Sequence, residues 1–228
     1  MVFITGDIHG NPTRIIDFYE SNALKDNDII IILGDVGANY YLNNRDNLMK
    51  SELNDIGIDI LCIHGNHEIR PLNLPSYHLS EWHGGKVWIE NDYPHLLFAK
   101  DGEIYNIEDN RYIAIGGAYS VDKYYRLAMH YGWWEDEQPS DEIKKYVENQ
   151  IDKDKINIVL SHTCPLKYEP REVFISQVNQ SKVDKSTEIW LDKIENSIEY
   201  DAWFCGHWHT DKKIDKMHFL FEGWEAIK

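Results

Sequence analysis

Five short apolar runs of the sequence are each followed at once by side chains that can bind a metal ion or move a proton. The five polar segments are Gly6-Asp7-Ile8-His9-Gly10, Gly34-Asp35, His64-Gly65-Asn66-His67-Glu68, Ser161-His162 and Gly206-His207-Trp208-His209. Their donors are oxygen and imidazole nitrogen, without a thiolate. Such donors are typical of Mn, Fe, Ni or Zn sites rather than of a structural zinc–cysteine site.

Each polar segment has a simpler interpretation when it is taken alone. An aspartate after a strand is often a helix N-cap, a lone histidine is usually a surface or packed residue, and Gly-Asn or Gly-Asp is an ordinary turn. Five such segments weaken this interpretation, because several buried imidazoles and carboxylates at one loop edge would be costly without a cation. The set therefore predicts a metal centre.

Buried strands must bring these segments together. The apolar runs are Val2–Thr5, Ile29–Leu33, Ile60–Ile63, Ile156–Leu160 and Ala202–Cys205. Their length and continuous apolarity are typical of strands buried on both faces. Helical patterns begin at Pro12 and Ser140 and cover Asn44–Leu53 and Thr187–Ile194. This alternation predicts an α/β core, in which ligands bind where loops converge beyond the carboxyl ends of the strands.

The middle and the end of the chain carry shorter runs with turn residues between them. Lys86–Ile89, Leu96–Phe98, Glu103–Ile107 and Arg111–Ile115 are spaced as an antiparallel meander or as hairpins, and Lys212–Ile214 with Met217–Phe221 repeats the pattern. We expect an α/β, or layered α+β, fold with two mixed β-sheets packed as a sandwich flanked by helices. No linker divides the chain, so residues 1–228 are expected to form a single domain.

The charge of the chain limits its partners. Among 228 residues, 23 Lys and Arg stand against 39 Asp and Glu, a formal net charge of -16. A long nucleic acid or an anionic membrane needs clustered basic residues and is not expected as a partner, whereas a short single strand stacked on aromatic rings stays open. Three cysteines without a CxxC pair, and no signal-peptide or membrane-spanning pattern, favour a cytoplasmic protein.

In chain order, GDIHG, GD, GNHE, SH and GHWH resemble the motifs of the calcineurin-like metallophosphoesterase superfamily, and residues 116–126 are similar to those of its small phage- and bacteria-type members. The resemblance implies two divalent transition metals (Mn, Fe, Ni or Zn, with Mn favoured) at the edge of a β-sandwich. It implies that Asp7, His9 and His209 bind the first metal and that Asn66, His162 and His207 bind the second. Asp35 would bridge the two.

The same resemblance implies a binuclear phosphohydrolase, either a phosphomonoesterase or a phosphodiesterase, in which a metal-bridging hydroxide attacks phosphorus. Asp35 and His67 are then the expected catalytic residues, and His67 would lie over the substrate without binding metal. Its imidazole titrates near neutral pH, so it can donate a proton to the leaving oxygen or stabilise the transition state. Asn66, His67 and Arg126 are the expected contacts to the substrate, a small nucleotide or phosphodiester.

Some residues depart from the pattern or have a second interpretation. Residues 34–39 read GDVGAN and lack the Asp and Arg of the GDxVDRG motif found in Ser/Thr protein phosphatases and dinucleotide polyphosphate hydrolases. These two activities are kept as alternatives, as is a non-catalytic scaffold of the same fold. Arg126 could instead be a surface charge paired with an acid. For Arg70 a salt bridge is favoured over a pocket contact, and for His64 packing is favoured over a place at the metal edge.

Overall fold

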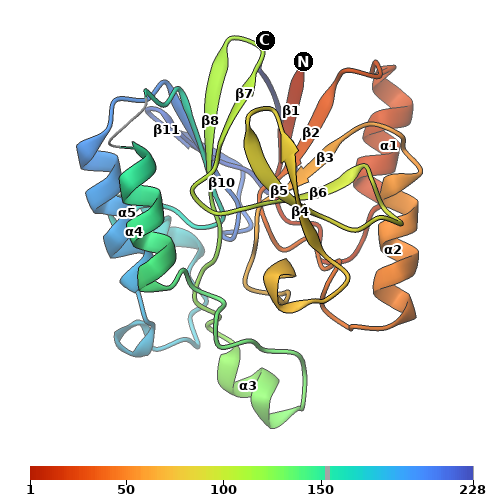
Figure 1. The fold of residues 1–228 in the computed structure, drawn as a ribbon. Coiled ribbons are helices and arrows are strands. Elements are labelled where there is room, and N and C mark those ends of the chain that lie inside the picture. Colours follow the sequence, from red (N-terminus) through yellow and green to blue (C-terminus); the bar gives the residue numbers. More distant parts are fainter. Residues whose placement is uncertain (152–154, 228) are drawn as a thin grey trace.

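Two β-sheets form the centre of the computed structural model, which describes residues 1–151 and 155–227 (Figure 1). One sheet has seven strands in the order β13-β1-β2-β3-β6-β5-β4: β1 Val2–Thr5, β2 Ile29–Ile32, β3 Ile60–Cys62, β4 His78–Trp82, β5 Gly85–Ile89, β6 Leu96–Ala99 and β13 Trp224–Ile227. The other has six strands in the order β11-β12-β10-β9-β8-β7: β7 Ile104–Ile107, β8 Asn110–Ile115, β9 Ile158–Ser161, β10 Ala202–Cys205, β11 Lys212–Ile214 and β12 Met217–Phe219.

The α-helices lie outside the sheets. They are α1 Thr13–Asn22, α2 Asn44–Asn54, α3 Lys123–Ala128, α4 Asp141–Ile151 and α5 Ser186–Ser197. Figure 1 shows α1 and α2 on one side of the paired sheets, α4 and α5 on the other, and α3 projecting below them. Two mixed sheets with helices outside confirm the predicted fold class. None of the described helices is both long and apolar enough to cross a lipid bilayer.

The alternation of side chains along buried strands explains the layering. In β2, Ile29 and Ile31 face the core between the two sheets, whereas Ile30 and Ile32 face the core under α1 and α2. Successive side chains of a strand point to opposite faces, so a run of four isoleucines supplies two cores at once. A third core lies between the six-stranded sheet and α4 and α5, and contains Trp190 and Val147.

The middle of the chain differs from a continuous meander. β5 pairs with β6, and β7 with β8, as antiparallel neighbours, but β6 and β7 belong to different sheets. Leu97 and Ala99 of β6 and Tyr105 and Ile107 of β7 all face the core between the sheets. Placing the two strands in opposed sheets buries both apolar faces against each other. The Asp101-Gly102 turn between β6 and β7, with Gly102 at φ +82°, is where the chain crosses.

Parallel pairing aligns the strand ends that carry the five polar segments. β1, β2 and β3 are parallel neighbours in one sheet, and β9 and β10 are parallel neighbours in the other. The two sheets meet at these ends, because His162 after β9 donates from Nδ1 to the carbonyl of Leu33 after β2 at 2.7 Å. The expected strand Ile156–Leu160 is observed as β9 at Ile158–Ser161, which sets His162 directly at its end.

Candidate metal centre

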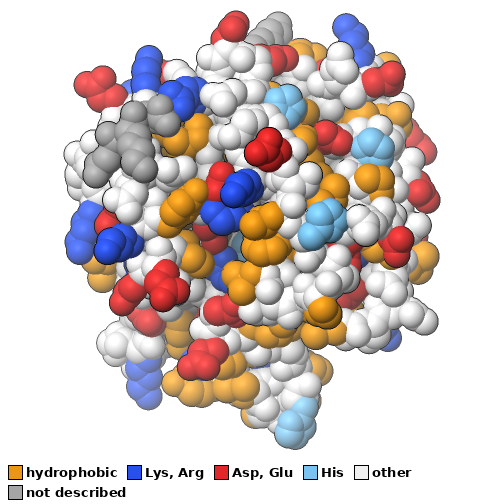
Figure 2. Space-filling model, viewed as in Figure 1, with side chains coloured by type: hydrophobic (Ala, Val, Ile, Leu, Met, Phe, Trp, Pro, Cys, Tyr) orange, Lys and Arg blue, Asp and Glu red, His pale blue; other side chains and the backbone are white. Residues whose placement is uncertain are grey.

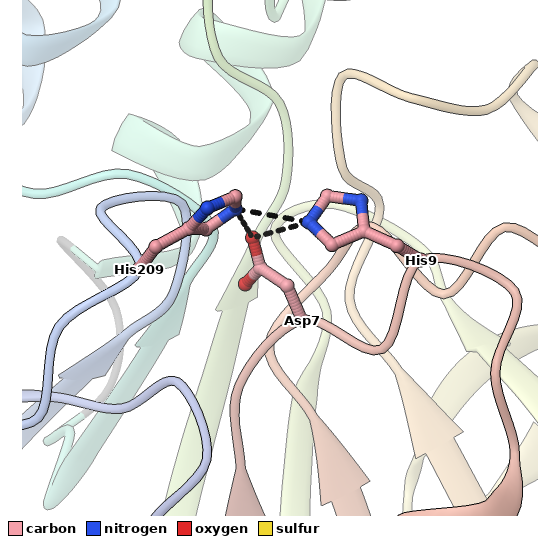
Figure 3. A group of neighbouring side chains, drawn as sticks. All are labelled: Asp7, His9 and His209. Atoms are coloured by element: carbon pink, nitrogen blue, oxygen red, sulfur yellow. Dashed lines mark hydrogen bonds and ion pairs between the residues drawn. The ribbon is translucent and has the colours of Figure 1, made fainter. Parts of the chain in front are cut away.

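The three side chains expected at the first metal lie side by side. Asp7 Oδ2 is 3.8 Å from His9 Nε2 and 3.4 Å from His209 Nε2, and the two Nε2 atoms are 2.9 Å apart. Figure 3 shows the carboxylate and both rings pointing toward one another, although they come from loops at opposite ends of the chain. Three donor atoms at such distances can bind one cation.

The side chains expected at the second metal meet beside this group. His162 Nε2 lies 2.9 Å from Asn66 Oδ1 and 3.5 Å from Asp35 Oδ1. The rings of His162 and His207 have centroids 5.0 Å apart, and the backbone N–H of His207 donates to Asp7 Oδ1 at 3.0 Å. The structure therefore brings all of these residues to one edge of the sandwich. The His207 ring approaches the group less closely than the Asn66 and Asp35 side chains approach His162.

Asp35 stands between the two groups. Its Oδ2 is 3.9 Å from His9 Nδ1, and its Oδ1 approaches His162. The ligand atoms of Asp7, Asp35 and His162 all lie within 4.8 Å of one another, as do those of His9, Asp35 and His67. The Asp35 side chain thus approaches a histidine ring of each group, within 3.9 Å of His9 and 3.5 Å of His162, which is the position that a bridging ligand needs.

The donor atoms fit a cation better than they fit one another. Asn66 Nδ2 donates to Ser120 Oγ, so Oδ1 is the atom that faces His162. Because Nδ1 of His162 donates to a carbonyl, Nε2 is the atom that carries the lone pair when the ring is neutral. Two acceptors facing each other repel unless a proton or a metal ion lies between them. Two donor atoms that each lie about 2.1 Å from one ion, with a right angle between the two bonds, are about 3 Å apart. The 2.9 Å between His162 Nε2 and Asn66 Oδ1 is close to this value.

Burial and neighbouring charges tune the ionisable groups. Burial alone would raise the pKa of Asp35, but the charges of His162, His67 and His9 outweigh it, and its pKa is lowered. Burial, followed by the charge of His162, lowers the pKa of His207 to about 3. At neutral pH the carboxylate is therefore ionised and His207 is neutral, the forms in which these groups bind metals.

The loops take up backbone conformations that their residue types rarely adopt. His9, Asp35, His207 and His209 have φ angles of +46°, +45°, +65° and +47°. Left-handed backbone is uncommon for residues other than glycine and is concentrated at functional sites. Four such residues at one edge indicate that the surrounding structure holds these side chains in place.

Glycines let the loops approach one another. A Cβ on Gly206 would lie 2.2 Å from Asp7 Oδ1 and 2.8 Å from the carbonyl of Leu33. We expect Gly206→Ala to displace Asp7, to lower the free energy of unfolding and to remove Mn²⁺ binding, as measured by chemical denaturation and equilibrium dialysis. Gly57→Ala is the control: its Cβ would meet nothing within 4 Å, so at φ +79° it carries only a backbone cost of about 1–3 kcal/mol. Equal Mn²⁺ binding by the two variants would contradict the expectation.

His67 lies at the open side of the centre. Its backbone N–H donates to Asp35 Oδ1 at 2.8 Å, and its ring stacks on Tyr40, with centroids 6.5 Å apart. By distance alone, His67 could also join His9 and Asp35 around an ion. Tyr40 was not singled out from the sequence, because one aromatic residue in a loop carries no spacing signal.

A buried cluster lies behind Asn66. In it, Arg126 was expected from the sequence to contact substrate, whereas Ser120 and Glu137 were not expected at the site. Arg126 is 1% exposed, and its Nη1 donates to Ser120 Oγ at 2.9 Å and to the carbonyl of Asn66 at 3.2 Å. Glu137 Oε1 accepts from the Ser120 N–H at 3.2 Å. The surface interpretation of Arg126 is therefore wrong, although Nη1 does form the expected ion pair with an acid, Asp122, at 3.8 Å. The guanidinium lies behind Asn66, and the side chain is not among those that line the adjacent cavity.

Ser120 fixes which atom of Asn66 faces the metal edge. We expect Ser120→Ala to weaken the binding of one of two Mn²⁺ ions about 10–100-fold, since a side chain that orients a metal ligand contributes on that scale. Isothermal titration calorimetry measures both affinities, and Ser21→Ala on the exposed side of α1 is the control. Unchanged affinities in Ser120→Ala would show that Asn66 needs no such support.

Arg70 and His64, near the metal ligands in the chain, are both buried. Arg70 forms an ion pair with Asp101, with 2.5 Å between Nη1 and Oδ2, and its Nε donates to the carbonyl of Asp136. The favoured salt-bridge interpretation of Arg70 is confirmed. His64 is 3% exposed and lies behind the metal edge, where its carbonyl accepts from the Gly117 N–H at 2.8 Å.

Comparisons with known proteins identify the family. A family model described as calcineurin-like phosphoesterase matches residues 1–211, which include all five polar segments. No curated protein matches the chain. A similar solved structure is the Thermus thermophilus sulfate thiohydrolase SoxB in complex with glycerol, with 11% sequence identity and a TM-score of 0.37. The alignment covers 94% of this chain and 36% of that chain, so this chain spans little more than a third of SoxB. The chain belongs to the calcineurin-like phosphoesterase family.

Proposed function

We propose that the chain is a binuclear metal-dependent phosphohydrolase acting on a small phosphomonoester or phosphodiester. Family membership implies metal-dependent phosphoester hydrolysis. The observation that supports two metals is the pair of donor groups joined through Asp35, which lies 3.9 Å from His9 and 3.5 Å from His162. We assign Asp7, His9 and His209 to one metal, Asn66, His162 and His207 to the other, and Asp35 to both.

The metals and the protein would divide the chemistry. When bound, two such cations, with Mn²⁺ favoured, would polarise the phosphoryl group and lower the pKa of a bound water. Asp35 holds the backbone of His67 through a 2.8 Å hydrogen bond, and the Tyr40 ring supports its imidazole. From there His67 would stabilise or protonate the leaving oxygen. Asn66 and His67 line the cavity beside the centre, whereas we assign buried Arg126 a role in holding Asn66.

The size of the cavity and the charge of the chain support a small substrate. The cavity that contains the metal edge measures about 350 Å³. On the face shown in Figure 2, Lys and Arg side chains are scattered among Asp and Glu and form no continuous band. That face therefore offers a long polyanion such as a nucleic acid little electrostatic attraction, because such binding depends on clustered Lys and Arg side chains.

Metal removal tests the proposal. We expect the Mn²⁺-loaded protein to hydrolyse p-nitrophenyl phosphate or bis(p-nitrophenyl) phosphate, to lose this activity after dialysis against a chelator, and to regain it when Mn²⁺ is added. Release of nitrophenolate measures the rate. Activity that survives complete metal removal would contradict the proposal. A protein that binds no metal and cleaves neither ester would support the scaffold alternative, and cleavage confined to phosphoproteins or dinucleotide polyphosphates would support the other two.

A further inference from the structure

The cavity at the metal edge has a second half that the proposed chemistry does not use. One end is lined by His9, Asp35, His67, His207 and His209. The other end is lined mainly by apolar side chains: Val121, Val173, Phe174, Ile175, Val178, Val183 and Trp208. A phosphoryl group between two cations needs no apolar wall. If the apolar half of the cavity binds a ligand, it contacts a part of that ligand other than the phosphoryl group.

The apolar wall comes mostly from the connection between β9 and α5, residues 162–185. This connection contains only the short 3-10 helices η2 Leu166–Tyr168, η3 Arg171–Val173 and η4 Gln180–Lys182. Long irregular connections at the edge of a sheet commonly carry binding residues. Ion pairs hold this one in place: Lys185 bonds Glu169 at 2.8 Å, and Glu172 pairs with Lys212 of β11.

Apolar side chains of the wall are open to solvent beside the metal edge. Val173 is 38% exposed, Ile175 56% and Val121, which lies in another segment of the chain, 38%. Exposed apolar groups that converge on a cavity gain free energy when an apolar ligand covers them. The wall therefore suits the uncharged part of a substrate.

The wall is close enough to bind a group attached directly to the phosphate. Trp208 stands between His207 and His209 in the chain, and its ring lies 5.2 Å from that of His207. On its other side Trp208 stacks on Phe174, with centroids 5.6 Å apart and planes 20° apart. The stacked rings of Phe174 and Trp208 thus lie directly beside the expected metal ligand His207.

The described residues that line this part of the cavity offer no free cation for a second phosphate. Lys185, the one lysine or arginine among the described lining residues, is already paired with Glu169. A second anionic group, such as that of a dinucleotide polyphosphate, would therefore lose its hydration without gaining an ion pair. An uncharged flat ring can pack against Phe174, Trp208 and the valines without this cost.

We propose that this chain cleaves phosphoesters whose leaving group carries an uncharged aromatic or heteroaromatic ring, and that the ring binds in the apolar half formed by Val121, Val173, Phe174 and Trp208. The proposal rests on the proposed function for the phosphoryl half of the cavity. Ring binding itself is a separate property, so the two can fail separately.

Two primary-alcohol esters of similar leaving-group acidity test it. We expect kcat/KM for 2-phenylethyl phosphate to exceed that for butyl phosphate at least 10-fold, either as monoesters or as methyl diesters, whichever form the protein cleaves. Val173→Asp is expected to reduce this ratio toward one. The matched control is Ile189→Asp, because Ile189 is also an exposed apolar residue, at 47%, but lies on α5 outside the cavity lining. Equal rates on both esters in the wild type would overturn the proposal.

A binding measurement separates failure of ring binding from failure of hydrolysis. Saturation-transfer NMR with 2-phenylethanol needs neither metal nor turnover, and we expect transfer to the ring protons in the wild type and Ile189→Asp but not in Val173→Asp. If these esters and the p-nitrophenyl esters all resist cleavage, the proposed function fails, and this signal still decides whether the apolar half binds a ring. Absence of transfer in the wild type would overturn the ring-binding proposal.

Discussion

Replacing Asp35 by Ala is expected to abolish hydrolysis and to reduce bound Mn²⁺ from two ions per chain to one or none. Asp35 is the carboxylate that approaches both His9 and His162, so its loss removes a shared donor from each group. It also removes the acceptor that holds the His67 backbone. We expect kcat/KM to fall by about 10³-fold or more, beyond the loss for one electrostatic contact to a transition state. Steady-state kinetics and metal analysis of the dialysed protein measure the two effects.

Asp28→Ala is the control for losing a buried aspartate. Asp28 is 6% exposed and accepts hydrogen bonds from the Met1 ammonium and the Lys25 N–H, at the end of β2 opposite to the metal edge. This variant should unfold more easily but keep its metals and its kcat. Undiminished hydrolysis by Asp35→Ala would refute the bridging role.

Replacing His67 by Ala is expected to give the opposite combination, in which metal is kept and turnover is lost. The contact between His67 and Asp35 runs through the backbone N–H, which alanine retains. The variant should therefore bind two Mn²⁺ ions with wild-type affinity, while kcat falls about 10²–10⁴-fold, the range for a general acid. Metal analysis and kinetics on the same sample make the comparison.

Loss of metal would contradict this expectation and would make His67 a ligand, a role that its distances to His9 and Asp35 also permit. Tyr40→Phe is the matched control, because it keeps the ring that stacks on His67 and removes only a hydroxyl. We expect its kcat to stay within a few-fold of the wild-type value.

The strands that carry the site could be predicted because their signals are local. Ile29–Ile32 is continuously apolar, β-branched, short and flanked by polar segments, and these features together favour a buried strand over a helix. The edge strand β4, His78–Trp82, has no apolar run, because most of its side chains are exposed. Its strand structure depends on pairing with β5, which is a tertiary property.

The residues that hold the metal-binding side chains in place could not be predicted from local patterns, because their contacts are also tertiary. Ser120 and Arg126 reach Asn66 across more than fifty residues of chain, so the similarity of residues 116–126 to small family members does not reveal that they hold Asn66. Asp35 and His207 adopt left-handed backbone against the preference of their residue types. The packing of the loops around these residues determines this conformation. Composition and spacing therefore predicted which residue types bind metal, but not the backbone conformation that positions their side chains.

The most direct test of the account is a crystal structure of the Mn²⁺-soaked protein with anomalous scattering data. We expect two anomalous peaks per chain, separated by about 3.5–4 Å, a typical spacing for two-metal sites. One should contact Asp7, His9 and His209, the other should contact Asn66, His162 and His207, and both should contact Asp35. A single peak, peaks elsewhere, or Asp35 bound to neither ion would contradict the binuclear centre.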